Sequence, residues 1–245
     1  MRAVVLVAAL LAARLGFADT LAERVAAAPD PIVRMSFAAR DGVCAHGGQS
    51  WEWRGGQDWE SACDGGPVRV QLEKEGAGIV RLQTYLGGGW RPREGVTDLG
   101  DVDAAAASAF LLKLAATARQ RVAENALMPA AIADAPDPWQ GLLALSRDTT
   151  LARGVRRQAI FWLGQSAARE ATAGLAAIAE DDAEAEVQKA AVFALSQGRD
   201  PTRVDALVKV ARRHPNPEVV KSALFWLAQS EDPRAVDLFE EILAR

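Results

Sequence analysis

Few side chains in this sequence are suited to covalent or metal chemistry. The chain contains two Cys and two His. Cys44 and Cys63 do not form a CxxC motif, and the only His near either of them is His46. A redox or metal pair is therefore the weaker interpretation. If the protein is exported, the two cysteines predict a disulfide, which contributes about 3 kcal/mol through chain entropy.

Hydroxyl and carboxyl groups form no recognisable catalytic pattern either. The serines in or near the expected helices have no matching His. Asp98, Asp101 and Asp103 lack the spacing of an EF-hand loop, and acids before a helix are more typical of caps. We therefore expect no enzymatic activity, no cofactor and no metal. The alternative is an enzyme or an enzyme accessory subunit of the cell envelope.

The N-terminal residues have the layout of a secretory signal peptide. In residues 1–18, Arg2 precedes an apolar stretch, and Gly16 and Ala18 supply small residues before Asp19. An N-terminal amphipathic or buried helix is the alternative. No later segment is long and apolar enough to cross a bilayer. We expect a periplasmic or secreted protein that does not insert into the membrane once the signal is removed.

The charge balance disfavours nucleic acid as a partner. The chain holds 28 Lys and Arg against 32 Asp and Glu, a formal charge of −4. Residues 1–18 contain two Arg and no acid, so their removal gives 26 − 32 = −6. A mildly acidic chain without a basic block is poorly suited to nucleic acid or to an anionic membrane surface.

The region after the signal predicts a small β unit. Residues 19–31 predict a short helix or linker, and residues 32–95 contain strand patterns. The clearest is a hairpin in 67–86, in which apolar residues alternate with polar ones, so that one face of the sheet is expected to be wet. The Cys44–Cys63 disulfide would stabilise a unit of this size.

The same region contains several tryptophans and is followed by a segment that contains Gly and Pro. Trp51, Trp53 and Trp59 could stack on a sugar ring, which leaves ligand or glycan binding by the β unit as a second alternative. Residues 91–103 are expected to be a link that contains Gly and Pro.

The C-terminal part of the chain is a repeat. FWLGQS at 161–166, FALSQG at 193–198 and FWLAQS at 225–230 follow one another at intervals of 32 residues. Three blocks, at 155–186, 187–218 and 219–245, agree in many columns, and each is expected to hold two helices. Asp or Asn followed by Pro marks expected helix starts at Pro201, Pro217 and Pro233. Such self-similarity predicts stacked units that bury their apolar faces on one another.

This pattern, V-x-[RK]-x-A-x-F-x-L-x-Q with Asp-Pro between helices, resembles HEAT repeats, most of all the short HEAT-like kind first described in phycobilisome lyases. The resemblance implies an α-solenoid of about three and a half helical hairpins over 104–245 after the β unit. It extends more loosely over 104–154, where a first helix is expected around Ala109–Leu114 and a second around Gly141–Leu145. The longer segment between them contains Pro129.

Two enzymatic relatives of that family are disfavoured by the residues present. Residues 155–245 contain no Cys and no chromophore cleft that the sequence reveals, which argues against a bilin lyase. Neither His46 nor His214 is followed by Glu, so the repeated His-Glu pairs of HEAT-repeat iron hydroxylases are missing.

Recurring polar residues are the candidate partner-binding groups. A basic column consists of Arg157, Lys189 and Lys221, and a glutamine column consists of Gln165, Gln197 and Gln229. One interpretation of these columns is a groove that holds another protein. The alternative is that the aliphatic parts of the basic side chains cover apolar surface, and that the glutamine amides form hydrogen bonds with backbone groups. We expect a non-enzymatic scaffold or regulatory protein that binds another protein. Trp162 and Trp226 share one column and are expected to lie in the core.

Overall fold

The computed structural model describes residues 20–46, 50–53, 65–76, 78–136, 138–166 and 168–244. The expected signal at 1–18 lies outside these residues, as do Trp59 and Cys63. The side chains of Cys44, Trp51 and Trp53 are likewise not described. The disulfide and the Trp-based ligand site therefore remain predictions.

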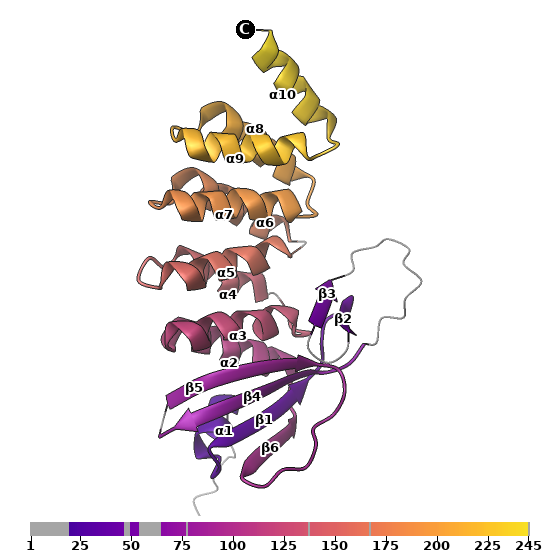
Figure 1. The fold of residues 1–245 in the computed structure, drawn as a ribbon, viewed down its shortest axis with the longest axis vertical. Helices are drawn as coiled ribbons and strands as arrows, with labels where there is room; N and C mark the ends of the chain where they lie inside the picture. The colour runs from indigo at the N-terminus through magenta and orange to yellow at the C-terminus, as the bar shows by residue number, and fades with distance from the viewer. Residues whose placement is uncertain are drawn as a thin grey trace, which may run out of the picture.

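The N-terminal unit is a small sheet. Its strands, in the order β5-β4-β1-β6, are Gly78–Leu86 (β5), Val68–Glu75 (β4), Ile32–Phe37 (β1) and Val96–Asp101 (β6). β4 and β5 form the expected antiparallel hairpin, in which Val70 pairs with Thr84 and Leu72 with Leu82. A separate pair of strands, β2 (Val43–His46) and β3 (Ser50–Trp53), lies beside the sheet (Figure 1).

Strand β6 lies within the segment that was expected to be a link. It pairs in parallel with β1, with Ile32 opposite Val96 and Val33 opposite Thr97. Val96, Leu99 and Val102 are too few, and too widely separated by Gly and Asp, to mark a strand by local pattern. The strand forms because β1 offers an unpaired edge to a chain that returns beside it.

The short helix α1 (Leu21–Ala27) is confirmed and is fixed at both ends. Thr20 and Glu23 form a capping box at its start. At its end the ammonium group of Lys74 on β4 donates to the carbonyls of Val25 at 3.1 Å and Ala28 at 2.6 Å. These bonds join the helix to the sheet.

One face of the hairpin is less wet than its alternation predicts. Gln71 is only 6% exposed, and its carbonyl oxygen accepts from Nε of Arg34 at 3.0 Å. The ring of Trp90 contacts two guanidinium groups, those of Arg34 at 4.6 Å and Arg69 at 4.8 Å from its centroid. The face that was expected to be wet is exposed at Arg81 but covered at Gln71, because the segment that follows β5 folds back over part of it.

The rest of the described chain is helical, so the protein is mostly helical with a small sheet before the helices. The helices are α2 (Ala104–Thr117), α3 (Gln120–Ile132), α4 (Pro138–Arg147), α5 (Arg153–Gly164), α6 (Arg169–Asp181), α7 (Ala185–Gln197), α8 (Thr202–Arg213), α9 (Pro217–Ala228) and α10 (Pro233–Leu243). None of the helices in the described residues is long and apolar enough to cross a membrane.

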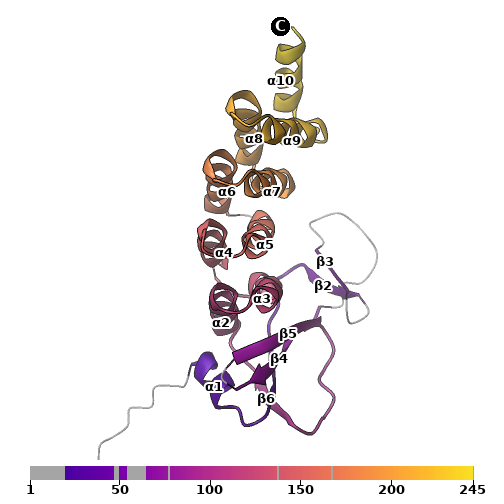
Figure 2. The same ribbon diagram turned by 60° about the vertical axis from the view of Figure 1, so that its left-hand side comes forward.

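These helices stack in two layers (Figure 2). The odd layer consists of α3, α5, α7 and α9, each of which packs on the next. The even layer consists of α2, α4, α6 and α8, which also pack in order. Neighbours in sequence pack most extensively as the pairs α2–α3, α4–α5, α6–α7 and α8–α9. α10 follows α9 at the end of the stack (Figure 1).

Helix α3 was not anticipated from the sequence. It occupies part of the long segment between the two helices expected in 104–154, and it holds Pro129 inside its last turns. Pro129 is buried, together with Ala126 and Ile132. Proline removes a backbone donor and disfavours a helix interior, so the local signal argued against this helix. Packing against α2, α5 and β5 compensates.

Two of the three expected Pro-marked helix starts are confirmed. Asn216 caps α9, where its side chain accepts from the backbone N–H of Glu218 at 2.9 Å. Asp232 caps α10 in the same way, at 3.0 Å from Arg234. In α8 the proline, Pro201, stands one residue before the helix rather than inside it.

Small residues set the spacing within each layer. A Cβ on Gly164 of α5 would lie 2.9 Å from the carbonyl oxygen of Ala194 on α7. In the even layer, Gly174 of α6 receives Leu143 of α4, whose methyl group would lie 2.6 Å from such a Cβ. Glycine at these two positions lets the neighbouring helices of each layer approach closely.

Candidate binding groove

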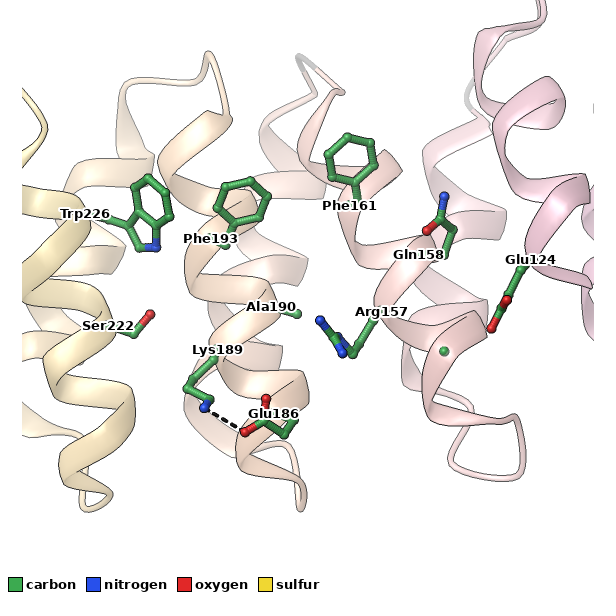
Figure 3. A pocket seen from close by; sticks show the side chains of 11 residues that line it. Glu124, Arg157, Gln158, Phe161, Glu186, Lys189, Ala190, Phe193, Ser222 and Trp226 are labelled. Atoms are coloured by element: carbon green, nitrogen blue, oxygen red, sulfur yellow. Dashed lines mark ion pairs between the residues drawn. The ribbon is translucent and has the colours of Figure 1, made fainter. Parts of the chain in front are cut away.

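A groove crosses the exposed side of the odd layer. It encloses about 580 Å³ and is open to solvent. The lining comes from four successive odd-layer helices, so no single helix forms it (Figure 3). The lining residues are Glu124, Gly154, Arg157, Gln158, Phe161, Glu186, Lys189, Ala190, Phe193, Ser222 and Trp226.

Aromatic rings form one wall of this groove. Phe161, Phe193 and Trp226 follow one another from α5 to α7 to α9 (Figure 3). The rings of Phe193 and Trp226 pack together with centroids 5.1 Å apart. All three side chains are only partly buried, so apolar ring surface remains available to a ligand.

Charged and polar side chains form the opposite wall. Lys189 makes an ion pair with Glu186 at 2.6 Å, one turn away on α7. The hydrogen bond from Lys189 holds the pKa of the Glu186 carboxyl below its ordinary value. Arg157 is exposed on α5, and Figure 3 shows its guanidinium group directed toward Ala190 on α7.

Two amide side chains continue the polar wall toward the sheet. Gln158 of α5 lines both this groove and a second cavity of about 420 Å³. The second cavity lies between β5 and α3 and includes Thr84, Tyr85 and Asn125. Asn125 donates to the backbone carbonyl of Leu82 on β5 at 3.3 Å. Because the two cavities share Glu124 and Gln158, they are adjacent to each other.

The structure separates the two polar columns of the repeats. Arg157 and Lys189 line the groove, and Lys221 is exposed on α9 beside the lining residue Ser222. The glutamines instead lie at the C-terminal ends of the odd-layer helices: Gln165 is the C-cap of α5, Gln197 is the last residue of α7 and Gln229 is the C-cap of α9.

Gln165 belongs to a third cavity of about 290 Å³. Its lining includes Trp139, Trp162, Arg40 and Arg199. Burial, together with the positive charge of Arg199, lowers the pKa of Arg40 to about 10. Gln165 therefore faces a different environment from Arg157, and the two columns do not form a single binding surface.

The two tryptophans of one repeat column have different environments. Trp162 on α5 is 2% exposed and belongs to the core, as expected. Trp226 on α9 is only partly buried and lines the groove, so the expectation of a core position was wrong for it. α5 has odd-layer neighbours on both sides, whereas α9 has α7 on one side and makes only limited contact with α10.

Behind the groove, a buried cluster of charges joins three helices and their turns. Arg156 of α5 is 1% exposed and donates from Nε to the backbone carbonyl of Ser146 at 3.1 Å. Its other nitrogens form ion pairs with Asp182 and with Glu184, the latter at 2.9 Å. Arg153 also pairs with Glu184. This cluster could not be predicted from the repeat pattern, because Arg156 has no basic counterpart at Gln188 or Val220.

The groove has the chemistry of a binding surface. Its lining offers apolar rings, one guanidinium group, one ion pair and the side chains of Gln158 and Ser222. Within the described ranges, no group of three or more His, Cys, Asp or Glu side chains is placed to hold a metal ion.

Comparison with known families gives one match. Residues 172–245 match the family model of HEAT repeats. The matched segment begins within α6 and includes α7 to α10, and thus two of the four helices that line the groove. The chain matches none of the curated proteins. In residues 172–245 this protein is therefore similar to HEAT repeats.

Proposed function

We propose that this protein is an exported scaffold or regulator that binds a segment of another protein in the groove of the odd layer. In this proposal residues 104–245 form an α-solenoid of HEAT-like hairpins, of the short kind first described in phycobilisome lyases. The protein contributes shape and contact surface, without catalysis. Supporting this, HEAT repeats commonly mediate contacts between proteins, and residues 172–245 match their family model.

The observation that carries the proposal is the aromatic row in the groove. The row consists of one ring from each of three successive odd-layer helices, namely Phe161, Phe193 and Trp226. Each side chain is only partly buried, so part of each ring is exposed to solvent. Partly exposed aromatic residues in a concave, polar-rimmed surface are the usual anchors of protein interfaces. A groove of about 580 Å³ that is open to solvent accommodates a chain segment.

Site-specific photo-crosslinking tests this proposal. A photoreactive amino acid is placed at Ala190 in the groove or at Ala173, an exposed residue on α6 in the even layer. We expect a discrete crosslinked protein from the Ala190 position in the native host and none from Ala173. The adduct should weaken when Phe193 is changed to Ala, because that change removes the central ring of the row.

Equal labelling from both positions would place binding elsewhere on the molecule. A strong adduct at Ala190 that is insensitive to Phe193→Ala would remove the aromatic row from the proposal. The folded state of each variant is checked by circular dichroism, so that a lost adduct is not the result of unfolding.

Export and the disulfide are tested on the purified mature protein. We expect its first residue to be Asp19, because Gly16 and Ala18 provide the cleavage site. We also expect no free thiol before reduction and two after it, from Cys44 and Cys63. An intact N-terminus with two reactive thiols would contradict both.

A further inference from the structure

One end of the helical stack exposes an apolar surface. The described residues include four large hydrophobic side chains that are exposed, and three of them, Val236, Ile242 and Leu243, lie on α10. These three are 54%, 45% and 85% exposed. α10 stands at one end of the stack, and the sheet stands at the opposite end (Figure 2). In the part of the chain that the structure describes, large exposed apolar side chains are thus concentrated at the α10 end.

The preceding repeat shows that these positions are normally covered. Val236 and Ile242 follow Val204 and Val210 by 32 residues, and the earlier pair lies on α8. Val204 and Val210 are each 1% exposed. The two helices differ in their neighbours, because α8 is packed against both α9 and α10. The exposure of α10 therefore comes from missing neighbours and not from the type of residue.

Helix α10 lacks a partner that the even-layer helices have. α2, α4, α6 and α8 each pack on the odd-layer helix that follows in the chain. α10 packs on α8 and so continues the even layer, but no helix follows it among the described residues. Ala235 and Leu238 are buried toward the stack. Val236, Phe239 and Leu243 form an adjacent stripe at helical spacing, which has no such cover.

Helix α9 adds an open side of its own to this surface. A Cβ at Gly164 of α5 would lie 2.9 Å from the carbonyl oxygen of Ala194 on α7, so this repeat position faces the next odd-layer helix. Ala228 is the equivalent residue of α9, and Leu224 lies one turn before it. Leu224 is only partly buried, whereas Val192, its equivalent on α7, is fully buried. The end face is defined by five residues of α9 and α10, namely Leu224, Ala228, Val236, Phe239 and Leu243.

A second copy of the same chain is the occupant that the fold favours. The end face continues the interface that joins successive repeats, so it suits another apolar helix pair. The start of the stack does not supply that pair, because α2 packs on α1, and α3 packs on β4 and β5. Two copies therefore meet end face to end face about a two-fold axis, which gives a closed dimer rather than a fibre.

The charges at the rim of the end face are compatible with this contact. Lys221 on α9 lies one turn before Leu224, and Glu240 on α10 lies one turn before Leu243. Both charged side chains are exposed. In a two-fold contact in which α9 of one copy lies over α10 of the other, Lys221 comes opposite Glu240. The face is therefore complementary to its own copy in charge as well as in apolar surface.

We propose that the end face binds the end face of a second copy of this chain. α10 of each copy takes the place of the odd-layer helix that the other copy lacks, and the stripe of Val236, Phe239 and Leu243 becomes buried. Leu224 and Ala228 are not among the residues that line the groove, so the dimer presents two open grooves. The inference goes beyond the proposed function, and neither depends on the other.

Sedimentation velocity of the purified mature protein tests this inference. The end face involves two short helices and is smaller than a standard interface, so we expect a reversible dimer with a Kd of about 10 μM. The protein should be mainly monomeric at about 1 μM and mainly dimeric at about 200 μM. Val236→Glu places a charge in the apolar stripe and should raise the Kd about tenfold or more. Because Val236 is already 54% exposed, the variant should stay folded, which circular dichroism checks.

Phe225→Glu is the matched control. Phe225 is 55% exposed, close to the value for Val236, and the added charge is the same. It takes the repeat position of Phe161 and Phe193, which line the groove, and lies outside the end face. The control should leave the Kd unchanged. If Phe225→Glu weakens the dimer as much as Val236→Glu, the added charge acts without regard to place and the end face is refuted as the interface.

Three other outcomes would overturn the proposal. A protein that stays monomeric at about 200 μM has no such interface. A dimer that is insensitive to Val236→Glu uses another surface. Species whose mass keeps growing with concentration are open head-to-tail assemblies, which contradict the two-fold contact. If the protein is monomeric, and a photoreactive amino acid at Val236 labels a different protein in the host, the end face belongs to that partner.

Discussion

The odd-layer helices have a buried side and a groove side, and α5 contrasts them at two adjacent residues. Arg156 is 1% exposed and pairs with Asp182 and Glu184 behind the layer. Arg157 is exposed in the groove and has no ion pair with the described residues. The same residue type thus holds the helices together on one side and remains available to a ligand on the other.

The tryptophan column repeats the contrast between helices. Trp162 is enclosed, whereas Trp226 stands in the groove wall. The comparison teaches that equivalent positions of the repeat can have different surroundings, because the helices that pack around α5 and α9 differ. The predictions below test this difference.

The largest expected effect is that of Trp162→Ala. Removal of a large buried ring leaves a cavity in the core and should lower the free energy of unfolding by about 3–5 kcal/mol. Trp226→Ala removes a partly exposed ring and should cost about 1–2 kcal/mol. Urea denaturation of the two variants measures both values. Equal losses would mean that the two sides do not differ in burial.

The next largest effect is expected for Arg156→Ala, which should lower the free energy of unfolding by about 3 kcal/mol. The change leaves Asp182 and Glu184 without their buried cation and the carbonyl of Ser146 without its donor. Arg157→Ala, its neighbour and control, should remain within about 0.5 kcal/mol of the parent. If Arg156→Ala is equally mild, the buried cluster does not stabilise the stack.

Gly164→Ala tests the contact between neighbours in the odd layer. The added methyl group would lie 2.9 Å from the carbonyl oxygen of Ala194, so α5 and α7 must move apart. We expect a net loss of about 1–2 kcal/mol, despite the better helix propensity of alanine. Gly89→Ala is the control, because nothing lies within 4 Å of a Cβ at Gly89. Thermal unfolding of both variants would show whether the loss is specific to Gly164.

The smallest effect is expected for the groove-side ion pair. This pair joins Glu186 and Lys189. The hydrogen bond that Lys189 donates lowers the pKa of the Glu186 carboxyl in the folded protein. The pair therefore stabilises the fold above the unfolded pKa of Glu186, and this contribution is lost as the pH falls through the lowered folded value. Glu186→Gln should remove that part of the acid dependence and should have little effect at high salt. If Glu186→Gln lowered the free energy of unfolding as much as Arg156→Ala, the groove-side ion pair and the buried cluster would not differ in their contribution to stability.

The repeat region shows how much local pattern reveals. The period of 32 residues, the helices α5 to α10 and the caps at Asn216 and Asp232 follow from short-range periodicity and capping preference. Helix α3 and strand β6 do not, because each depends on partners that are distant in the chain. Pro129 disfavours helix α3 and the glycines near β6 disfavour that strand. Packing against the distant partners offsets this local cost in free energy.

The candidate site was only partly visible in the sequence. Arg157 and Lys189 were identified as recurring groups, and they line the groove. Gln165 was grouped with them, but it lies in another cavity. The aromatic row was missed, although two of its members, Phe161 and Phe193, are 32 residues apart and lie off the stripe of Val155 and Ala159. An apolar residue outside the core stripe of a repeat was the available signal.

The sequence by itself determined that helical units recur, where most of them begin and which residues take equivalent places in each unit, because capping and periodicity act over a few residues. Only the tertiary structure decided that Arg156 is enclosed while Arg157 is open, and that Trp226 lines a groove while Trp162 fills the core. Burial depends on how many helices surround a position, and that number is a property of the assembled layers rather than of any one repeat.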